Sequence, residues 1–599
     1  GIQLGEHYAV GMVFLSQDDG LAARARHRLE TELMAEGLVT AGWRRVPVDA
    51  SVCGNYALSI LPRIEQIFIN AESTLSNERF ERHLYIARRR AKKNIKTKDS
   101  DFHVVTLSTQ VLCYKGLVLP HNLPLFYTDL KDERLASSLC IFHQRFSTNT
   151  WPEWRLAQPF RYLAHNGEIN TIQGNRNWAQ ARSYKFDTDL IHNMDDIRPW
   201  VSMTGSDSYS LDNMLEAMLA GGMDIFLAMR LLIPRAWQNM KLMDPDLRAF
   251  YEYYSMHMEP WDGPAGIVLT DGRYAACVMD RNGLRPARYV ITKDRHITLA
   301  SEIGVYDYTP EMVVSKGRLR PGDMFAVDTE NGNVLLPEDI DNDLKSRYPY
   351  REWLKQQVMY LESSFAQEEA CNVAMNSERL KVYRKMFQVS NEEMEQVIKV
   401  LANGGQEAIG SMGDDTPLPV FSNQQRSIYD YFRQQFAQVT NPPIDPLRES
   451  IVMSLETCFG NEQNLFEHNA EHAVRIVVNS PVLSVSKFNQ LLAVEDRRFR
   501  HYELDMNIAA SVSLETAIRQ LCLQAAEAVR DGVRILVLSD RNIKQGCLPV
   551  HALLATGAVH HHLIDEGLRC DTNIVVETAT ARDPHHFAAL IGYCLLYTS

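Results

Sequence analysis

The sequence contains no apolar stretch long enough to cross a membrane as a helix, which takes about 18 residues or more. Its longest apolar run, around Ala588–Tyr597, is much shorter and includes a glycine. Basic residues are fewer than acidic ones, 62 against 75, so the charge balance does not favour broad binding of nucleic-acid phosphates. The ten cysteines form no C-x-x-C pair, so neither a disulfide framework nor a zinc ribbon is predicted. We therefore expect a reducing, cytoplasmic compartment.

What the sequence does contain is typical of a globular protein with several domains. Its 599 residues are 45% hydrophobic and 23% charged, and this length predicts about two to three large domains. The chain opens with Gly1-Ile2-Gln3 and soon reaches a strand-like run, Tyr8–Leu15, so we expect a fragment without its natural start. Its last six residues, Cys594–Ser599, look like a translated sequencing adapter, and we expect them to be non-native.

Residues 1–350 mix short strands with helices. Leu21–Glu36 has apolar residues at helical spacing and is predicted to be an amphipathic helix. Ile64–Asn70 and Val104–Leu107 are predicted to be strands. Apolar runs flank Asp271-Gly272, a pair typical of hairpins, so the stretch Gly263–Asp328 is predicted to be antiparallel sheet.

The pattern changes after residue 350. Residues 351–407 are polar and helical in spacing, without strand signals, and are predicted to be a helical connector. Further along, Ser513 is a predicted N-cap for a helix over Leu514–Arg530. The apolar runs Arg534–Asp540 and Asn573–Glu577 each end in an acidic residue and are predicted to be strands. Strands that alternate with helices predict parallel α/β units, which are the units of barrels.

Several conspicuous patterns have ordinary explanations. The basic run Arg88–Lys93 has no interleaved aromatic residues and is interpreted as a solvated helix face. Gly410–Asp414 is glycine-rich but lacks the Lys-Ser/Thr ending of a phosphate loop, so a turn or interdomain contact is favoured. The aromatic stripe Ile428–Phe436 is interpreted as core. Histidines at 560–562 and 585–586 lack the spacing of a metal site, and a surface or subunit-contact role is favoured.

Three short segments in the first half contain polar residues that could take part in binding or catalysis. They are His143–Thr150, His165–Asn170 and Thr204–Ser208. Each alone has an ordinary explanation: a surface arginine, an Asn-Gly turn and a helix N-cap. Together and in this order, they resemble the glutaminase domain of class II glutamine amidotransferases, a family of N-terminal-nucleophile enzymes.

The chemistry of free glutamine explains why such a site needs these residue types. Arg145 can hold the α-carboxylate with a bidentate fork. Asp207 can accept hydrogen bonds from the α-ammonium. The Asn166 amide and the Gly167 backbone N–H can donate to the oxyanion that forms when the carboxamide is attacked. Glycine at 167 lets the backbone approach the substrate without a clash from a Cβ atom.

The resemblance also implies a nucleophile, a cysteine at the N-terminus whose own α-amino group acts as the base. Residue 1 here is glycine. Cys53 lies in a tempting Cys-Gly pair, but an internal cysteine has no free amine, so we interpret it as an ordinary semi-buried thiol. We therefore expect this chain to lack the nucleophile and to be inactive alone.

Further segments make the resemblance more specific. These segments are Gln144–Arg182, Met256–Pro264, Asp280–Pro286, Gly410–Pro417, Phe432–Glu449 and Arg569–Phe587. They are similar to the large (alpha) subunits of bacterial glutamate synthases along nearly the whole chain. That resemblance implies an α+β glutamine amidotransferase of the N-terminal-nucleophile hydrolase type, a four-layer αββα sandwich, followed by an α/β barrel-like central domain. The implied divisions are 1–350 for the truncated glutaminase domain, 351–407 for the connector, 408–593 for the truncated central domain and 594–599 for the non-native tail.

The same resemblance implies the function of the parent protein. Glutamine is hydrolysed, and the ammonia passes internally to 2-oxoglutarate, where reduction gives two glutamates. FMN and a 3Fe-4S cluster belong to a synthase part with no counterpart in this sequence. NADPH, FAD and 4Fe-4S clusters act through a small (beta) subunit, in an oligomeric enzyme. We therefore expect the residues given to bind no cofactor and no metal, and no nucleic acid or membrane.

Two alternatives stay open. The chain itself fits a non-catalytic glutamine-binding module that keeps Arg145, Asn166, Gly167 and Asp207. The glutaminase domain could also serve another acceptor, such as an amino sugar or a phosphoribosyl compound. The sequence does not choose between NADPH, NADH and ferredoxin as electron donor, although the bacterial resemblance favours NADPH.

Overall fold

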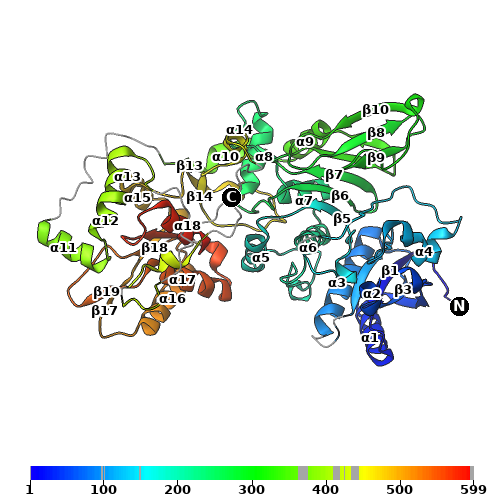
Figure 1. The fold of residues 1–599 in the computed structure, drawn as a ribbon, viewed down its shortest axis with the longest axis horizontal. Coiled ribbons are helices and arrows are strands. Elements are labelled where there is room, and N and C mark those ends of the chain that lie inside the picture. Colours follow the sequence, from blue (N-terminus) through cyan, green and yellow to red (C-terminus); the bar gives the residue numbers. More distant parts are fainter. Residues whose placement is uncertain are drawn as a thin grey trace.

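The structure is a computed structural model, and it describes residues 2–95, 99, 101–147, 150–361, 376–408, 419–423, 425–433 and 444–593. Figure 1 shows the sheets of the first half of the chain (blue to green) at one end of the molecule. The helices and strands of the last part (orange to red) lie at the other end. Helices α5 (Ile172–Ala181) and α8 (Pro245–Ser255) lie between the two ends.

The N-terminal part forms a four-stranded antiparallel sheet in the order β2-β3-β1-β4. Its strands are β1 (Tyr8–Leu15), β2 (Val39–Arg45), β3 (Arg63–Asn70) and β4 (His103–Ser108). Apolar residues of α1 (Asp19–Ala35) and α3 (Asn77–Asn94) share one buried cluster with residues of this sheet. The predictions of a helix over Leu21–Glu36 and of strands at β1, β3 and β4 are confirmed to within a few residues.

A second antiparallel sheet has five strands in the order β12-β11-β7-β6-β5. The strands are β5 (Leu163–Gly167), β6 (Ala265–Thr270), β7 (Tyr274–Met279), β11 (Met324–Asp328) and β12 (Asn333–Leu335). A three-stranded antiparallel sheet, β10-β8-β9, consists of β8 (Arg288–Thr292), β9 (Ile297–Ala300) and β10 (Val313–Arg318). The hairpin predicted at Asp271-Gly272 joins β6 to β7 and is confirmed.

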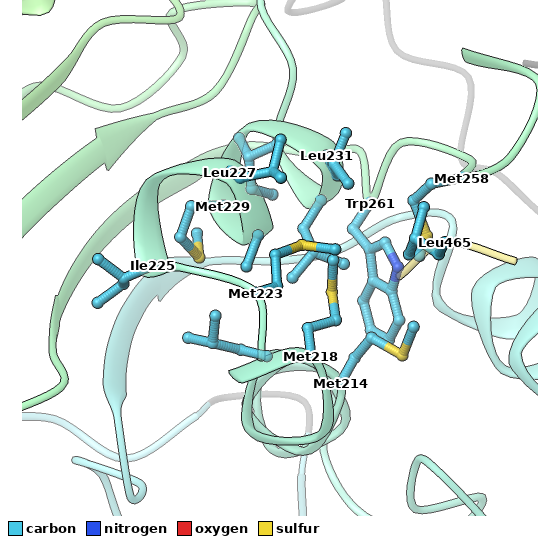
Figure 2. Packing of buried hydrophobic residues seen from close by; sticks show 14 of the residues in the cluster. Met214, Met218, Met223, Ile225, Leu227, Met229, Leu231, Met258, Trp261 and Leu465 are labelled. Atoms are coloured by element: carbon cyan, nitrogen blue, oxygen red, sulfur yellow. The ribbon is translucent and has the colours of Figure 1, made fainter. Parts of the chain in front are cut away.

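Helices pack against the five-stranded sheet through a core rich in methionine. Besides α5 and α8 they are α6 (Asp207–Ala220), α7 (Ile225–Leu232), α9 (Pro337–Ser346) and α10 (Tyr350–Gln357). Figure 2 shows Met214 and Met218 of α6 beside Met223 and the indole of Trp261. Methionine has three rotatable bonds and fills irregular gaps, so it suits a core where helices meet at unequal spacings. This packing fixes α6, whose first residue is Asp207.

The C-terminal part contains the predicted parallel α/β units. Strands β16 (His501–Asp505), β18 (Ile535–Ser539) and β20 (Asn573–Glu577) form a parallel sheet. The helices are α11 (Ser377–Met386), α12 (Asn391–Glu393), α13 (Lys399–Gly404), α14 (Pro446–Val452), α15 (Val485–Leu492), α16 (Leu514–Arg530), α17 (Ala552–Asp565) and α18 (Pro584–Gly592). Strands β17 (Asn507–Ala509) and β19 (Cys547–Pro549) pair separately. The Ser513 side chain accepts from the Thr516 N–H and caps α16, as predicted.

The connector predicted over 351–407 is not entirely helical. Val358–Tyr360 forms a short strand, β13, beside β15 (Arg475–Val478), which also pairs with β14 (Thr457–Phe459). The segment is short and lacks alternating polarity, and its partner lies far away in the sequence. Local patterning therefore gave no strand signal.

Three other interpretations of polar and aromatic residues need correction. Arg88 and Arg89 are buried instead of solvated, because Arg88 pairs with Glu216 and Arg89 donates to the backbone carbonyl of Ile197. His560 is also buried, where it accepts a hydrogen bond from Arg569. In the aromatic stripe Tyr429 is core, but Tyr431 is exposed. The glycine-rich segment Gly410–Asp414 lies outside the described residues, as does Phe436.

The described part of the chain contains neither a candidate membrane span nor a candidate metal site. None of its helices combines the length and the apolar character that a membrane span requires. None of its side-chain groups brings together three or more of the residue types that hold metal ions. The eight cysteines within the described ranges are all free thiols.

Candidate functional site

The candidate site is built around the end of β5, an edge strand of the five-stranded sheet. His165, Asn166 and Gly167 are its last three residues, and Gly167 lies opposite Ala265 of β6. The His165 ring is buried, and its Nδ1 lies 2.8 Å from the Ser208 Oγ of α6. Burial lowers the pKa of His165, which favours the neutral imidazole at physiological pH. Two of the three predicted segments therefore meet here.

Gly167 is required by its backbone conformation and by a close approach of another chain segment. Its φ is +153°, and a Cβ atom there would lie 1.7 Å from the Pro264 carbonyl oxygen. Gly263 mirrors it with φ +154° and a Cβ position 1.9 Å from the Glu168 carbonyl oxygen. The Glu168 N–H donates to Pro264 O (2.9 Å) and the Asn170 N–H to Asp262 O (2.8 Å). Paired glycines thus let the segments 166–170 and 262–264 run in contact.

Asp207 links the third segment to the second. Ser206 caps α6 by accepting from the Tyr209 N–H, which places Asp207 in the first turn of the helix. The Asp207 carboxylate accepts from the Ile169 N–H at 2.8 Å and from the Ser208 hydroxyl at 3.1 Å. It lies 3.8 Å from His165 Nδ1. A carboxylate at a helix N-terminus is favoured by the helix dipole, so its negative charge is stabilised where the motif segments meet.

The Asn166 amide is held by a residue that the sequence reasoning missed. Its Nδ2 donates to the Ser301 Oγ at 3.2 Å, and Ser301 directly follows β9. Asn166 is half-buried, so its amide is placed at the end of β5 without being enclosed. No motif marks Ser301, which lies 135 residues from Asn166 in the sequence and follows a strand of a different sheet.

Two further residues missed by the sequence reasoning shape the strand itself. The Gln158 carboxamide accepts from the His165 N–H (2.6 Å) and donates to the His165 carbonyl (3.1 Å), so it replaces a neighbouring strand at the free edge of β5. The buried Asp212 carboxylate accepts backbone N–H groups at the start of β5, from Tyr162 (2.9 Å) and Leu163 (3.3 Å). Burial raises the pKa of Asp212 to about 6.

Arg145 is not joined to these residues in the structure. Its side chain is exposed and forms no hydrogen bond or ion pair with other described residues. The neighbouring Phe146 packs against the core that also contains β5 and α6, and His143 is close enough for its charge to contribute to the lowered pKa of His165. The structure thus brings Asn166, Gly167 and Asp207 together, with the segment of Arg145 nearby. Thr148 and Asn149 lie outside the described residues.

Cys53 packs away from this arrangement. It belongs to a separate apolar cluster with Phe14 and Val46 of the N-terminal sheet region, and burial raises the pKa of its thiol. A raised pKa disfavours the thiolate, which is the nucleophilic form. An ordinary structural thiol fits these surroundings.

A cavity of about 930 Å³ is lined in part by the segment that precedes Asp207. It is lined by α3, by residues 151–155 and by residues 198–204, up to Thr204. Neither Asn166 nor Asp207 lines it. The cavity therefore borders the candidate site without containing its polar groups.

Comparisons with known proteins identify the family of the chain. Residues 1–353 match the family model described as glutamine amidotransferases class-II, and residues 382–595 match the model of the glutamate synthase central domain. The chain is 40% identical over 98% of its length to the glutamate synthase [NADPH] large chain of Bacillus subtilis. It is 42% identical to ferredoxin-dependent glutamate synthase 2 of Synechocystis and 39% identical to the glutamate synthase [NADPH] large chain of Azospirillum brasilense, again over 98% of the chain.

The chain spans only 38% to 39% of the length of these three relatives. Both family models fall within it in the order predicted from the sequence, amidotransferase first and central domain second. The chain therefore belongs to the class II glutamine amidotransferases and, among them, to the family of glutamate synthase large chains.

Proposed function

We propose that residues 1–353 are a glutamine-binding glutaminase domain and that the site is the end of β5. The observation that carries this proposal is the hydrogen bond from the Ile169 N–H to Asp207 at 2.8 Å. It places a carboxylate beside the Asn166-Gly167 pair, so an acceptor for an ammonium group and donors for an oxyanion lie on one small surface. Free glutamine carries both of the groups that such a surface would recognise.

In this proposal each residue has a separate role. Asp207 accepts hydrogen bonds from the α-ammonium of glutamine, and Arg145 holds the α-carboxylate when its exposed side chain turns toward the site. The Asn166 amide and the Gly167 N–H stabilise the oxyanion. We propose that residues 1–599 alone bind glutamine without hydrolysing it, because the family nucleophile is an N-terminal cysteine with a free amine and Cys53 is internal.

The wider activity is also a proposal. The complete protein would pass ammonia from this site to 2-oxoglutarate and reduce the product to glutamate, with FMN and a 3Fe-4S cluster bound outside these residues. A small subunit would supply electrons from NADPH through FAD and 4Fe-4S clusters, although relatives named for NADPH and for ferredoxin are similarly close. We further propose that the amidotransferase part completes a four-layer αββα sandwich. In the same way the parallel strands β16, β18 and β20 would belong to a barrel-like central domain, in a cytoplasmic, oligomeric enzyme.

Isothermal titration of residues 1–599 with glutamine tests the proposal. Wild type is expected to bind, and Asp207→Asn is expected to weaken binding about tenfold or more, since a charge-assisted hydrogen bond contributes roughly 1.5–3 kcal/mol. Asn177→Ala serves as the control, because this side chain of α5 is exposed and accepts a hydrogen bond from Gln173 on the same helix. Absence of binding by wild type, or equal loss in both variants, would contradict the assignment. Ammonia release by wild type would contradict the inactivity of the chain.

A further inference from the structure

A buried group of charged residues joins the amidotransferase part to the central part. The Arg182 guanidinium donates to Glu259 through Nη1 and to Glu462 through Nε, both at 2.5 Å. All three side chains are buried, and Arg182 is 1% exposed. Arg182 and Glu259 lie within the residues that match the amidotransferase model, whereas Glu462 lies within those that match the central-domain model. One arginine therefore bridges carboxylates from the two parts.

Both chain segments that meet at the candidate site are connected to this group, one through α5 and the other through residues 260–261. Residues 166–171 lead directly into α5, and Arg182 is the residue that ends α5. The opposing segment 262–264, which accepts the Glu168 and Asn170 N–H groups, begins three residues after Glu259. Asn175 of α5 also donates to Glu259 (3.4 Å) and to the Pro260 carbonyl (3.2 Å). A shift of Arg182 or Glu259 would consequently be passed to the backbone on each side of the site.

Charge and packing make this group costly to disturb. A second guanidinium, that of Arg569, helps to balance the charge of Glu462, and both guanidinium groups lie within 5.6 Å of the Trp178 ring centroid. Met258 and Trp261 share an apolar cluster with Leu465 of the central part, as Figure 2 shows. Breaking one partner of a buried pair leaves an uncompensated buried charge, which is strongly unfavourable.

We propose that Arg182, Glu259 and Glu462 form a positioning triad through which the central part holds the two glutamine-site segments in register. None of the three touches the proposed substrate position; they act through the backbone of 166–170 and 262–264. The role in glutamine binding rests on the function proposed above. The mechanical role does not, because it concerns only how firmly these two segments are held together.

The same boundary offers a matched control. Lys185 pairs with Asp571 at 2.5 Å and also contacts Asn461. This second pair joins the same two parts of the chain, but neither partner hydrogen-bonds to the segments of the site. Glu462→Gln and Asp571→Asn each remove one charge without changing the shape of the side chain. A general weakening of the boundary would therefore affect both variants, whereas a positioning role is specific to Glu462.

Hydrogen exchange of residues 1–599, read at the Glu168 and Asn170 amides, tests the mechanical role. Glu462→Gln is expected to speed exchange of these amides about tenfold, and Asp571→Asn to leave them within about twofold, in line with the size of coupling along packed networks. Glu462→Asp serves as a second variant, since it keeps the charge and draws it away from Arg182. It is expected to give an intermediate acceleration.

Glutamine titration of the same variants tests the link to binding. Glu462→Gln is expected to raise the Kd for glutamine about tenfold and Asp571→Asn to leave it within about twofold. Equal effects of both variants on exchange, or no effect of Glu462→Gln, would overturn the triad. Failure of wild type to bind glutamine would overturn the proposed function alone, because the exchange comparison would still decide the mechanical role.

Discussion

Carboxylates fix backbone in both halves of the molecule, but they do so with different partners. In the amidotransferase part, Asp207 and Asp212 of α6 reach across to β5 and to the residues that follow it, and accept backbone N–H groups there. In the central part, Asp540 and Glu577 follow or end neighbouring strands of one parallel sheet. Asp540 accepts from the Thr578 hydroxyl and the Ala579 N–H, and Glu577 accepts from the side chains of Ser539 and Arg541. The first pair joins a helix to a loop, whereas the second joins strands that are already hydrogen-bonded.

This difference explains where a ligand site can form. Around β5 the carboxylates of α6 hold the backbone from outside the sheet, before Asn166 at Leu163 and after Gly167 at Ile169, while Asn166 and Gly167 themselves pair with β6. At the carboxyl edge of β18 and β20, each acidic side chain accepts a hydrogen bond from a residue at the end of the other strand. The edge of a parallel sheet is a common ligand position, yet here its polar groups are engaged in holding the edge itself. This contrast supports the site proposed at the end of β5.

The largest expected difference in the free energy of unfolding is between the variants Asp212→Ala and Glu577→Ala. Asp212 is fully buried and accepts from backbone N–H groups that would lose their partner, so its removal is expected to cost about 4 kcal/mol or more. Glu577 is half-buried and accepts only from side chains, those of the exposed Arg541 and the buried Ser539, so its removal is expected to cost about 1–2 kcal/mol. Denaturant unfolding of residues 1–599 measures both. Equal losses would mean that the two kinds of carboxylate contribute equally to the stability of the fold.

A second contrast lies within a few residues of the site. Gly167→Ala would force a Cβ atom into the Pro264 carbonyl at a positive φ, and is expected to cost about 2–4 kcal/mol. Gly174→Ala lies in α5 with no atom within 4 Å of the new Cβ, and is expected to stabilise by about 0.5–1 kcal/mol. Thermal unfolding distinguishes the two signs. If Gly167→Ala is neutral, the close approach of the segment 262–264 is wrong.

The sequence predicted those parts of the fold whose cause is local. Apolar periodicity located α1, the Asp271-Gly272 turn located the β6–β7 hairpin, and a serine cap located the start of α16. It did not predict β13, whose only reason to be a strand is a partner more than a hundred residues later in the chain. Arg88 was predicted to be solvated for the same reason. Its partner, Glu216, is distant in the sequence, and no pattern around Arg88 indicates this ion pair.

The residues of the candidate site also differ in how far the sequence could predict them. Asn166, Gly167 and Asp207 were selected because their residue types match a chemistry and an order along the chain. Gln158 and Ser301 were missed, although they contact the same strand, because a supporting residue needs only a suitable position and no special residue type. Arg145 was selected on the same grounds, and its exposed position shows that residue type alone does not determine where a side chain lies.

The smallest expected contrast concerns two helical ion pairs, one in each part. Arg28 of α1 pairs with Glu32, a buried residue, whereas Arg519 of α16 pairs with Glu515 where both side chains are largely exposed. Solvent screens the second pair, so Arg519→Ala is expected to cost about 0.3 kcal/mol and Arg28→Ala about 1 kcal/mol. Unfolding in low and high salt measures both, and the smaller loss should vanish at about 1 M salt. If both losses vanish, burial of Glu32 does not protect its pair, and the contrast between the parts does not extend to helical ion pairs.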